Sequence, residues 1–364
     1  MGNRALAGEI RTFPCSACGA SMVFDPPTQG MACAPCGART PLPSPREILD
    51  ESDLEAALKA GEGNPAEPGV RRVRCGGCAA EMALSQGLEA LACAFCGLPQ
   101  VAEDVPGDGV LPPEGVLPFR VDRAGAVSGF RQWLSKRWFA PSDLKRRGET
   151  EMLKGAYVPF WTYDARADSE WTALSGTYYY TTETYRDSQG RTHTRQVRHT
   201  RWWPSSGSHA GAYDDVPVCA SKVLPAEHLS AIEPFDFSAF QPYDPRLLAG
   251  YQAEAYALSL REGWQAAAAR MRAWEERECD AQVPGDTHMN LNVSTALSDL
   301  YFKLVLLPVW VAAYRYRGKT YRFLVNGQTG EVRGDSPWSY WKIAGVVLAV
   351  LVLLGGLLLW ADLR

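Results

Sequence analysis

Cys15-Ser-Ala-Cys18 and Cys33-Ala-Pro-Cys36, separated by fourteen residues, decide the fold of the N-terminal part of the chain. The same spacing returns sixty residues later in Cys75-Gly-Gly-Cys78 and Cys93-Ala-Phe-Cys96. Two Cys-x2-Cys turns held by a β-hairpin supply the four soft ligands that a tetrahedral Zn²⁺ requires. The repeat therefore predicts two tandem four-cysteine zinc ribbons, and two structural Zn²⁺ ions are expected on Cys15, Cys18, Cys33, Cys36, Cys75, Cys78, Cys93 and Cys96.

Disulfides and redox or Fe–S chemistry are the alternatives for these cysteines. A small secreted protein with this cysteine count would suggest a disulfide framework. This chain has 364 residues and no N-terminal secretory signal, so we expect a reducing cytosol and metal-bound thiolates. Four thiolates close the coordination shell and leave no position for an activated water, which predicts a structural metal.

The C-terminal region carries the second clear pattern. Ile343 to Trp360 is an uncharged apolar run of eighteen residues with aromatic side chains near both ends. As a helix it would be about 27 Å long, close to the hydrocarbon thickness of a bilayer. We predict a transmembrane helix over 341–360, with a buried helix of a globular domain as the alternative. Because thiolates need a reducing compartment, the expected location is the cytoplasmic membrane, with a single pass and the N-terminal body in the cytoplasm.

Composition shifts and Pro/Gly-rich stretches divide the rest of the chain. The predicted fold class is multi-domain α+β, with two small β ribbons, a β-rich α+β domain and the C-terminal membrane helix. The predicted units are zinc ribbon 1 over 11–40, a helix and linker over 41–70, zinc ribbon 2 over 71–101, a Pro/Gly linker over 102–118, the α+β domain over 119–335 and the membrane helix over 341–360.

Local patterns predict the main elements of the α+β domain. Helices are expected over 124–138 and 251–280, and long strands over 171–185 and 192–203, joined by the turn Asp187-Ser-Gln-Gly190. Tyr157-Val-Pro-Phe-Trp161 and Leu306-Leu-Pro-Val-Trp310 echo each other, which suggests duplicated β sheets.

No catalytic motif emerges from the sequence. Arg317-Gly-Lys-Thr320 resembles the end of a phosphate-binding loop but lacks the earlier glycine, since Ala313 stands there, and it lies between strands. No small-molecule substrate is evident either, so we do not expect an enzyme.

One strand is rich in basic residues at period two, ahead of Trp202-Trp203. Two interpretations are open: an anion-binding ladder, which would be functional, and a solvated hairpin face, which we favour. The basic residues are Arg191, His193, Arg195, His199 and Arg201. A second metal site is a weaker hypothesis, using His193, His199, His209, Asp214 and Asp215. Cys219 and Cys279 lack Cys-x2-Cys partners and are expected to be small core residues.

Four stretches carry a family resemblance: 13–19 around the first knuckle, 157–161, 306–310, and Val325-Asn-Gly-Gln-Thr-Gly330. With them the chain resembles bacterial tail-anchored membrane proteins with N-terminal zinc ribbons, often labelled primosomal-protein-N′-like (replication factor Y, helicase-like) or transcription-factor-IIB-type zinc ribbon proteins. The resemblance implies a link to membrane-stress systems with phage-shock-type and flotillin-like partners. The ATP-binding motifs of a helicase are not found.

Two functions follow as hypotheses. The first is a zinc-binding, membrane-tethered cytoplasmic adaptor whose ribbons dock protein partners, in a membrane-stress assembly if the resemblance holds. The alternative is a membrane-anchored nucleic-acid-binding protein that acts through its ribbons and the Arg191–Arg201 strand. The formal net charge of −4 counts against the second hypothesis.

Overall fold

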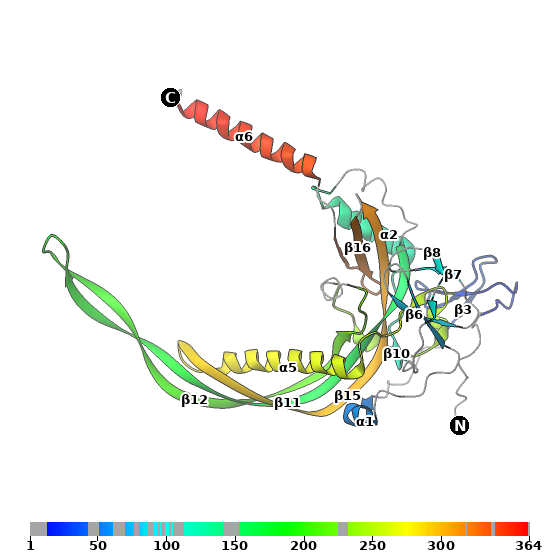
Figure 1. Ribbon diagram of the computed structural model, residues 1–364, viewed down its shortest axis with the longest axis horizontal. Helices are drawn as coiled ribbons and strands as arrows, with labels where there is room; N and C mark the ends of the chain where they lie inside the picture. Colours follow the sequence, from blue (N-terminus) through cyan, green and yellow to red (C-terminus); the bar gives the residue numbers. More distant parts are fainter. Residues whose placement is uncertain are drawn as a thin grey trace.

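The fold is dominated by one large, mainly antiparallel β-sheet (Figure 1). The computed structural model describes residues 13–42, 51–60, 70–75, 80–85, 90–93, 95, 99–101, 103–104, 113–140, 153–224, 232–316, 319–335 and 339–362. Within these ranges four α-helices occur: α1 (Leu54–Ala60), α2 (Arg123–Ser135), α5 (Leu260–Gln282) and α6 (Tyr340–Asp362).

Three strands are far longer than the rest and build the sheet: β11 (Leu153–Arg186), β12 (Thr192–Cys219) and β15 (Thr287–Tyr316). Shorter strands join this sheet at its edges: β4 (Ser52–Asp53), β10 (Gly115–Val116), β13 (Gln241–Pro242), β14 (Gln252–Ala253), β16 (Lys319–Asn326) and β17 (Val332–Gly334). The N-terminal region adds small sheets made of β1 (Val23–Asp25), β2 (Gly30–Ala32), β3 (Arg39–Pro41), β5 (Val70–Arg74), β6 (Glu81–Ser85), β7 (Ala90–Ala92), β8 (Pro99–Val101) and β9 (Glu103–Asp104). Two short 3-10 turns lie at Phe237–Ala239 and Pro245–Leu248.

The two echoing motifs lie next to each other in the centre of the sheet. β11 and β15 are antiparallel, and Val158 lies opposite Leu307 while Pro159 lies opposite Leu306. The echo therefore marks two adjacent strands of one sheet, and the expected duplication of sheets was wrong.

Both faces of this central region are buried, and side chains alternate strictly between them. On β11, Tyr157 packs into one hydrophobic cluster, whereas Ala156 and Val158 pack into another. β15 repeats the alternation: Trp310 belongs to the first cluster and Leu307 to the second. Such a doubly covered sheet fixes its register, because a slip of one residue would exchange the two faces.

α5 covers the concave side of the curved sheet formed by β11, β12 and β15 (Figure 1). It begins at Leu260, not at the expected residue 251, because Ser259 caps it. The Ser259 side chain accepts the Glu262 N–H, and the Glu262 carboxylate accepts the Ser259 N–H. The residues before this capping box are extended, and β14 pairs with β11 there. Leu260 and Met271 on one face of α5 are buried against the sheet.

The β11–β12 hairpin continues beyond the last residues that pair with β15. β11 last pairs with β15 at Gly176, whereas its pairing with β12 continues to Arg186. Residues 177–201, which we call the arm, thus form a two-stranded ribbon that projects away from the body (Figure 1). The predicted turn at residues 187–190 is confirmed at its tip.

α6 projects from the upper end of the body in the view of Figure 1. A helix needs about 20 predominantly apolar residues to cross a bilayer. In the part of the chain that the structure describes, no helix, α6 included, combines sufficient length with sufficient apolarity. The predicted span at 341–360, the membrane as a partner and the location at the cytoplasmic membrane were therefore wrong. The fold class is corrected to a β-rich protein with a large antiparallel sheet, four described helices and no spanning helix among them; the other predicted domain limits stay predictions.

Candidate metal centre and projecting arm

The first Cys-x2-Cys pairs form two similar knuckles. Cys15 N–H donates to the Ala20 carbonyl at 2.7 Å, and Cys33 N–H donates to the Ala38 carbonyl at 2.9 Å. Each knuckle closes on a glycine with a φ of +74°, Gly19 and Gly37, a left-handed conformation that disfavours residues with a Cβ. Glycine directly after the second cysteine of each pair therefore allows the tight turn that points both thiols inward.

The four thiols of ribbon 1 converge on one point. Their Sγ atoms all lie within 4.8 Å of one another, with 3.6 Å between Cys15 and Cys36 and 3.5 Å between Cys18 and Cys33. A tetrahedral Zn²⁺ with Zn–S bonds of about 2.3 Å has S···S edges of about 3.8 Å. The cluster could therefore hold a metal ion, and its donor set and dimensions are consistent with zinc.

Without a metal ion, the thiols of this cluster differ in their pKa values. Backbone N–H groups of Ala17 and Cys18 lower the pKa of Cys15 to about 7. The backbone N–H of Cys36 also favours a thiolate at Cys33, but burial and the neighbouring thiols raise the pKa of Cys33 to about 12. A bound cation stabilises all four thiolates, so metal binding would release protons.

Ribbon 1 is built into the body. Cys15 and Cys33 are buried in the same hydrophobic cluster as Tyr157 and Trp310 of the central sheet. Further hydrogen bonds join the two parts: Phe24 N–H donates to the Ala249 carbonyl at 2.9 Å, and the Gln29 side chain donates to the Phe119 carbonyl at 2.7 Å. The metal centre thus lies next to the core of the sheet.

Half of the second cysteine set lies within the described residues. Cys75 N–H donates to the Ala80 carbonyl at 2.8 Å, the counterpart of the Cys15 contact sixty residues earlier. The β7–β8 hairpin pairs Ala90 with Val101, and the β2–β3 hairpin pairs Gly30 with Pro41, again with a shift of sixty residues. Cys78 and Cys96 lie outside the described residues, so the second predicted site stays a prediction.

Cys75 and Cys93 are buried in the cluster on the opposite face of the central sheet. They pack there with Phe95 and with Val158 of β11. The two ribbons therefore flank one sheet from both sides.

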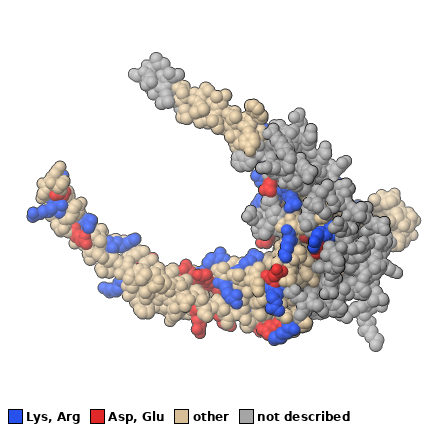
Figure 2. Space-filling view, viewed as in Figure 1, with Lys and Arg blue, Asp and Glu red and all other residues tan. Residues whose placement is uncertain are grey.

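The predicted basic ladder lies on the arm, and the strand register confirms that His193, Arg195, His199 and Arg201 share a face, whereas Arg191 lies in the turn before β12. His193 lies opposite Tyr185, His199 opposite Tyr179 and Arg201 opposite Thr177. Blue arginine side chains follow the arm in the space-filling view (Figure 2). The arm carries five arginines and two acidic side chains, a net charge of +3 in a chain whose net charge is −4.

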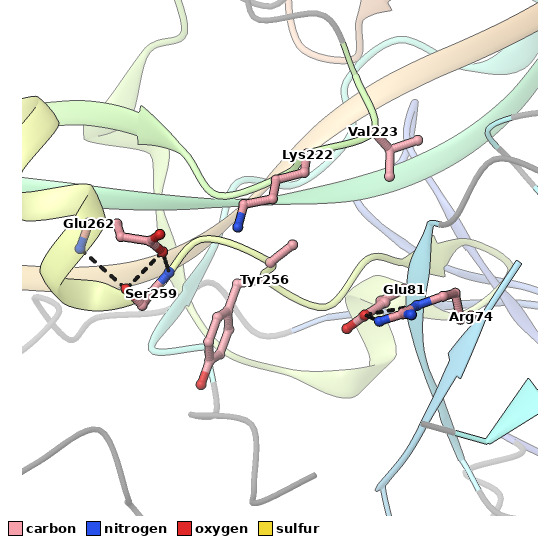
Figure 3. Close-up of a pocket in the computed structure, with 8 residues that line it drawn as sticks. Arg74, Glu81, Lys222, Val223, Tyr256, Ser259 and Glu262 are labelled. Atoms are coloured by element: carbon pink, nitrogen blue, oxygen red, sulfur yellow. Dashed lines mark hydrogen bonds and ion pairs between the residues drawn. The ribbon is translucent and has the colours of Figure 1, made fainter. Parts of the chain in front are cut away.

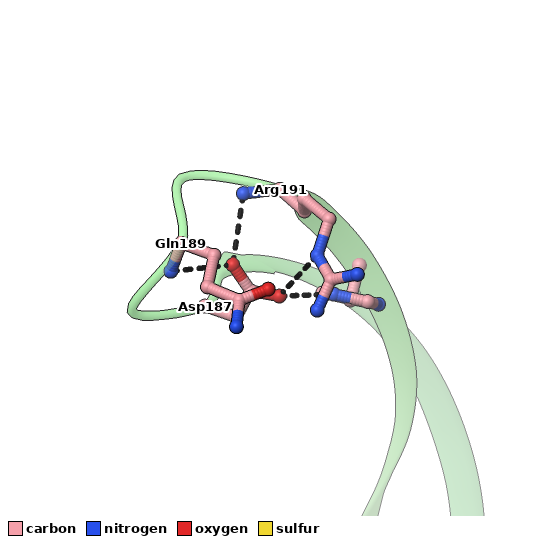
Figure 4. A network of polar contacts seen from close by, with 4 residues as sticks. Asp187, Gln189 and Arg191 are labelled. Atoms are coloured by element: carbon pink, nitrogen blue, oxygen red, sulfur yellow. Dashed lines mark hydrogen bonds and ion pairs between the residues drawn. The ribbon is translucent and has the colours of Figure 1, made fainter.

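Part of this positive charge is neutralised locally. Arg195 pairs with Glu183 at 3.0 Å and Arg191 with Asp187 at 2.9 Å. At the tip, the Asp187 carboxylate also accepts the backbone N–H groups of Gln189 and Arg191 (Figure 4). The His193 side chain and these donors hold the pKa of Asp187 below its usual range.

Aromatic rings interleave with the arginines along the arm. Arg198 lies over the ring of Tyr178 at 4.3 Å and Arg201 over Tyr179 at 5.8 Å. Tyr180 and Tyr185 are nevertheless 61% and 48% exposed. A two-stranded ribbon on its own is marginally stable in water. Large aromatic side chains that stay exposed on such a ribbon suggest a surface that contacts another molecule.

The structure separates the residues of the second hypothetical metal site. His193 and His199 lie on the arm, whereas Nδ1–H of His209 donates to the Glu275 carboxylate of α5 at 2.8 Å. Asp214 is grouped with Glu51 and Asp164 instead. The five residues are therefore not one site.

A buried network around Glu275 escaped the sequence analysis. Its carboxylate, fully buried, accepts hydrogen bonds from Ser169 at 2.8 Å and Tyr213 at 2.6 Å, in addition to the His209 contact. Ser169 also bonds Thr295, so the network joins α5 to all three long strands. Two hydroxyls and one imidazole from the sheet thus hydrogen-bond to one carboxylate of α5. These contacts hold the helix against the sheet.

A cavity of about 490 Å³ separates ribbon 2 from the start of α5 (Figure 3). Arg74 and Glu81 form an ion pair on one wall, and the Ser259–Glu262 capping box forms another. Lys222 lies between them and, after the Ser259 hydrogen bonds, contributes to lowering the pKa of Glu262. The charged side chains that line this cavity therefore interact with one another, Arg74 with Glu81 and Lys222 with Glu262.

No protein-family model matches the chain. It is similar to the protein named "Uncharacterized protein YdjG" of Bacillus subtilis (strain 168), with 26% identity over 338 residues, which cover 92% of each chain. The similarity thus extends over most of the chain. The resemblance to zinc-ribbon proteins labelled primosomal-like stays a prediction.

Proposed function

We propose that the protein is a zinc-stabilised adaptor, in which two four-cysteine ribbons brace a rigid sheet and the projecting arm docks a protein partner. The observation that carries this proposal is the arm itself. Residues 177–201 extend beyond the three-stranded part of the sheet, and tyrosine rings are exposed along them. A rigid base with a long, exposed ribbon is suited to presenting a surface at a distance from the body.

The chemistry of the arm indicates the type of partner. Its net charge of +3 favours an acidic protein surface, and Tyr180 and Tyr185 supply large contact areas at a low entropic cost. Main-chain pairing is a second contribution, because β12 is an edge strand of the central sheet. We therefore infer an acidic partner that contacts the arm.

Zinc in both ribbons is part of the proposal. The sulfur geometry of ribbon 1 supports one Zn²⁺, and the sixty-residue shift of the Cys75 contact and of the β7–β8 register supports a second. Because the ribbons pack on opposite faces of the sheet, we assign them a bracing role in addition to any docking by their exposed knuckles.

Nucleic-acid binding by the arm is the second candidate. Arginine and tyrosine side chains alternate on the arm, and a two-stranded ribbon fits the major groove of DNA. The ion pairs of Arg191 and Arg195 with acidic neighbours reduce the charge available for phosphates. We therefore rank this candidate second.

The test compares the zinc-loaded full chain with a variant whose arm is shortened by replacing residues 181–197 with Asn-Gly. This turn joins Tyr180 to Arg198, which are directly opposite each other, so the remaining sheet keeps its register. We expect proteins recovered with the full chain, after nuclease treatment, to be lost with the shortened variant. Binding of each recovered protein, once purified, is then measured by calorimetry.

The nucleic-acid candidate is tested by the salt dependence of oligonucleotide binding. An Arg195→Ala/Arg201→Ala variant removes charge from the ladder face, and Arg186→Ala/Arg198→Ala removes the same charge from the opposite face. Phosphate contacts predict a fall of the salt slope by about 1–2 in the first variant only. Oligonucleotide binding with that pattern, together with no protein lost from the shortened variant, would replace the adaptor proposal.

A further inference from the structure

Asp164 occupies an irregular position in the middle of β11. The register with β12 shifts between Tyr163 and Ala165, and the register with β15 shifts between Asp164 and Arg166. Both neighbouring strands thus bulge around one residue. Bulges of this kind redirect side chains and often occur next to functional sites.

Three carboxylates meet at this position. Ligand atoms of Glu51, Asp164 and Asp214 lie within 4.8 Å of one another. Glu51 and Asp214 are exposed, whereas Asp164 is only 8% exposed and lies beneath them. The cluster is therefore open to solvent on one side and has a buried carboxylate on the other.

The buried carboxylate is only partly satisfied. Asp164 Oδ1 accepts the backbone N–H of Asp215 at 2.6 Å, but Oδ2 is buried and has no hydrogen-bond partner. Thr162, two residues earlier on the same face of β11, is fully buried and its hydroxyl also lacks a hydrogen-bond partner. Buried polar groups are almost always satisfied in native proteins, so these atoms point to a ligand that completes their contacts.

The local charge is also unbalanced. The Lys303 ammonium pairs with Glu51 at 3.1 Å and with Asp215 at 2.9 Å. No ion pair between described residues includes Asp164 or Asp214. The Lys303 charge also acts on Asp164, so one ammonium is shared among three carboxylates. A buried carboxylate with only a shared counter-charge is costly.

We propose that Glu51, Asp164 and Asp214 form a binding site for a divalent cation of the Ca²⁺ type. Carboxylate oxygens are hard ligands, which suit Ca²⁺ and Mg²⁺. Mg²⁺ usually keeps several of its waters and binds through one or two carboxylates, whereas Ca²⁺ takes six to eight oxygen ligands in a flexible geometry. Three carboxylates from three separate segments therefore suit Ca²⁺ better, and open solvent on the Glu51 and Asp214 side leaves room for waters.

Such an ion would connect three separate parts of the chain. Glu51 directly precedes β4, which pairs with the edge of β15, while Asp164 and Asp214 belong to β11 and β12. The cation would therefore fix the segment that contains α1 to the middle of the sheet, within its three-stranded part. This role is independent of the thiolate sites and of any partner of the arm.

Calorimetric titration of CaCl2 into the zinc-loaded full chain tests the proposal, with MgCl2 titrated in parallel. We expect saturable binding of one Ca²⁺ per chain, with weaker binding of Mg²⁺. Asp164→Asn and Asp214→Asn should each raise the dissociation constant for Ca²⁺ by about tenfold or more. Thermal unfolding should shift upward with Ca²⁺ in the wild type and not in these variants.

Asp168→Asn is the matched control. Asp168 is exposed on the same face of the same strand, four residues further on, and lies outside the cluster. Because Asp214 is exposed, Asp214→Asn keeps the test decisive even if Asp164→Asn fails to fold. Absence of saturable Ca²⁺ binding in the wild type, equal binding in Asp214→Asn, or tighter binding of Mg²⁺ would overturn the assignment.

Discussion

Cys33 and Cys93 are buried on opposite faces of one β-sheet. Cys33 packs in the cluster that contains Tyr157, and Cys93 packs in the cluster that contains Val158, the next residue of the same strand. Adjacent residues of a strand point to opposite faces, so the two ribbons cover the sheet from both sides. A defect in either ribbon is thereby transmitted to the body of the protein.

The first prediction concerns Cys33→Ser. Loss of one thiolate should abolish metal binding in ribbon 1, lower the zinc content by one ion per chain, and lower the Tm of the whole body by about 10 °C or more. Mass spectrometry and circular dichroism measure the two effects. Cys219→Ser, at a half-buried cysteine outside both sets, is the control and should keep the wild-type zinc content. A body that melts at the wild-type temperature without the ribbon 1 metal would contradict the bracing role.

The second prediction concerns Gly211→Ala. A Cβ at this position would overlap Oε1 of Glu275, whose carboxylate is held by Tyr213 and Ser169. Displacing the buried carboxylate from its donors should cost about 1–3 kcal/mol of unfolding free energy, measured by urea denaturation. Ser208→Ala, at an exposed position of the same strand, should change it little. Equal denaturation midpoints for wild type and Gly211→Ala would refute this account.

The third prediction is a pH dependence that originates from Glu275. Burial acts to raise its pKa, but hydrogen bonds from His209, Tyr213 and Ser169 outweigh burial and hold it below the usual value. The folded protein therefore prefers the ionised carboxylate, and this contribution is present above the unfolded pKa and is lost as the pH falls through the folded pKa. The stability difference between wild type and Glu275→Gln should shrink below about pH 4. A difference that grows on acidification would contradict the sign.

The fourth prediction concerns the tip of the arm. Asp187→Ala removes the acceptor for the N–H groups of Gln189 and Arg191, so the turn should fray while the body stays intact. The amide of Arg191 should exchange with solvent about tenfold faster, as measured by hydrogen–deuterium exchange. Asp168→Ala, at an exposed aspartate of β11 outside the turn, should leave this amide unchanged. Unchanged exchange in Asp187→Ala would mean that strand pairing alone holds the tip.

The sequence predicted those features that depend on short-range patterns. The ribbon 1 cysteine cluster, the turn at residues 187–190 and the shared face of the basic ladder all follow from spacing between nearby residues. The start of α5 was missed because the apolar period continues upstream, whereas the Ser259–Glu262 capping box determines where the helix begins.

Contacts between distant residues could not be predicted from spacing. Glu275 meets Ser169 across 106 positions, and the grouping of Glu51 with Asp164 and Asp214 depends on bulges that no local pattern marks. The apolar run near the C-terminus predicted a membrane span, but no described helix meets the combined demands of length and apolarity. The second cysteine set was predicted by repetition, and only Cys75 and Cys93 of its members are described.

The arm has one further property, which follows from its two-stranded register between Thr177 and Arg201. Removing or adding residues in matched pairs on both strands changes the length of the ribbon, yet each remaining side chain keeps its side because the strand period is two. The reach of this protein can therefore change by increments of about 6–7 Å, through paired insertions or deletions of two residues per strand, without any cost to the core. Evolution can set the distance between body and target independently of the fold that supports it.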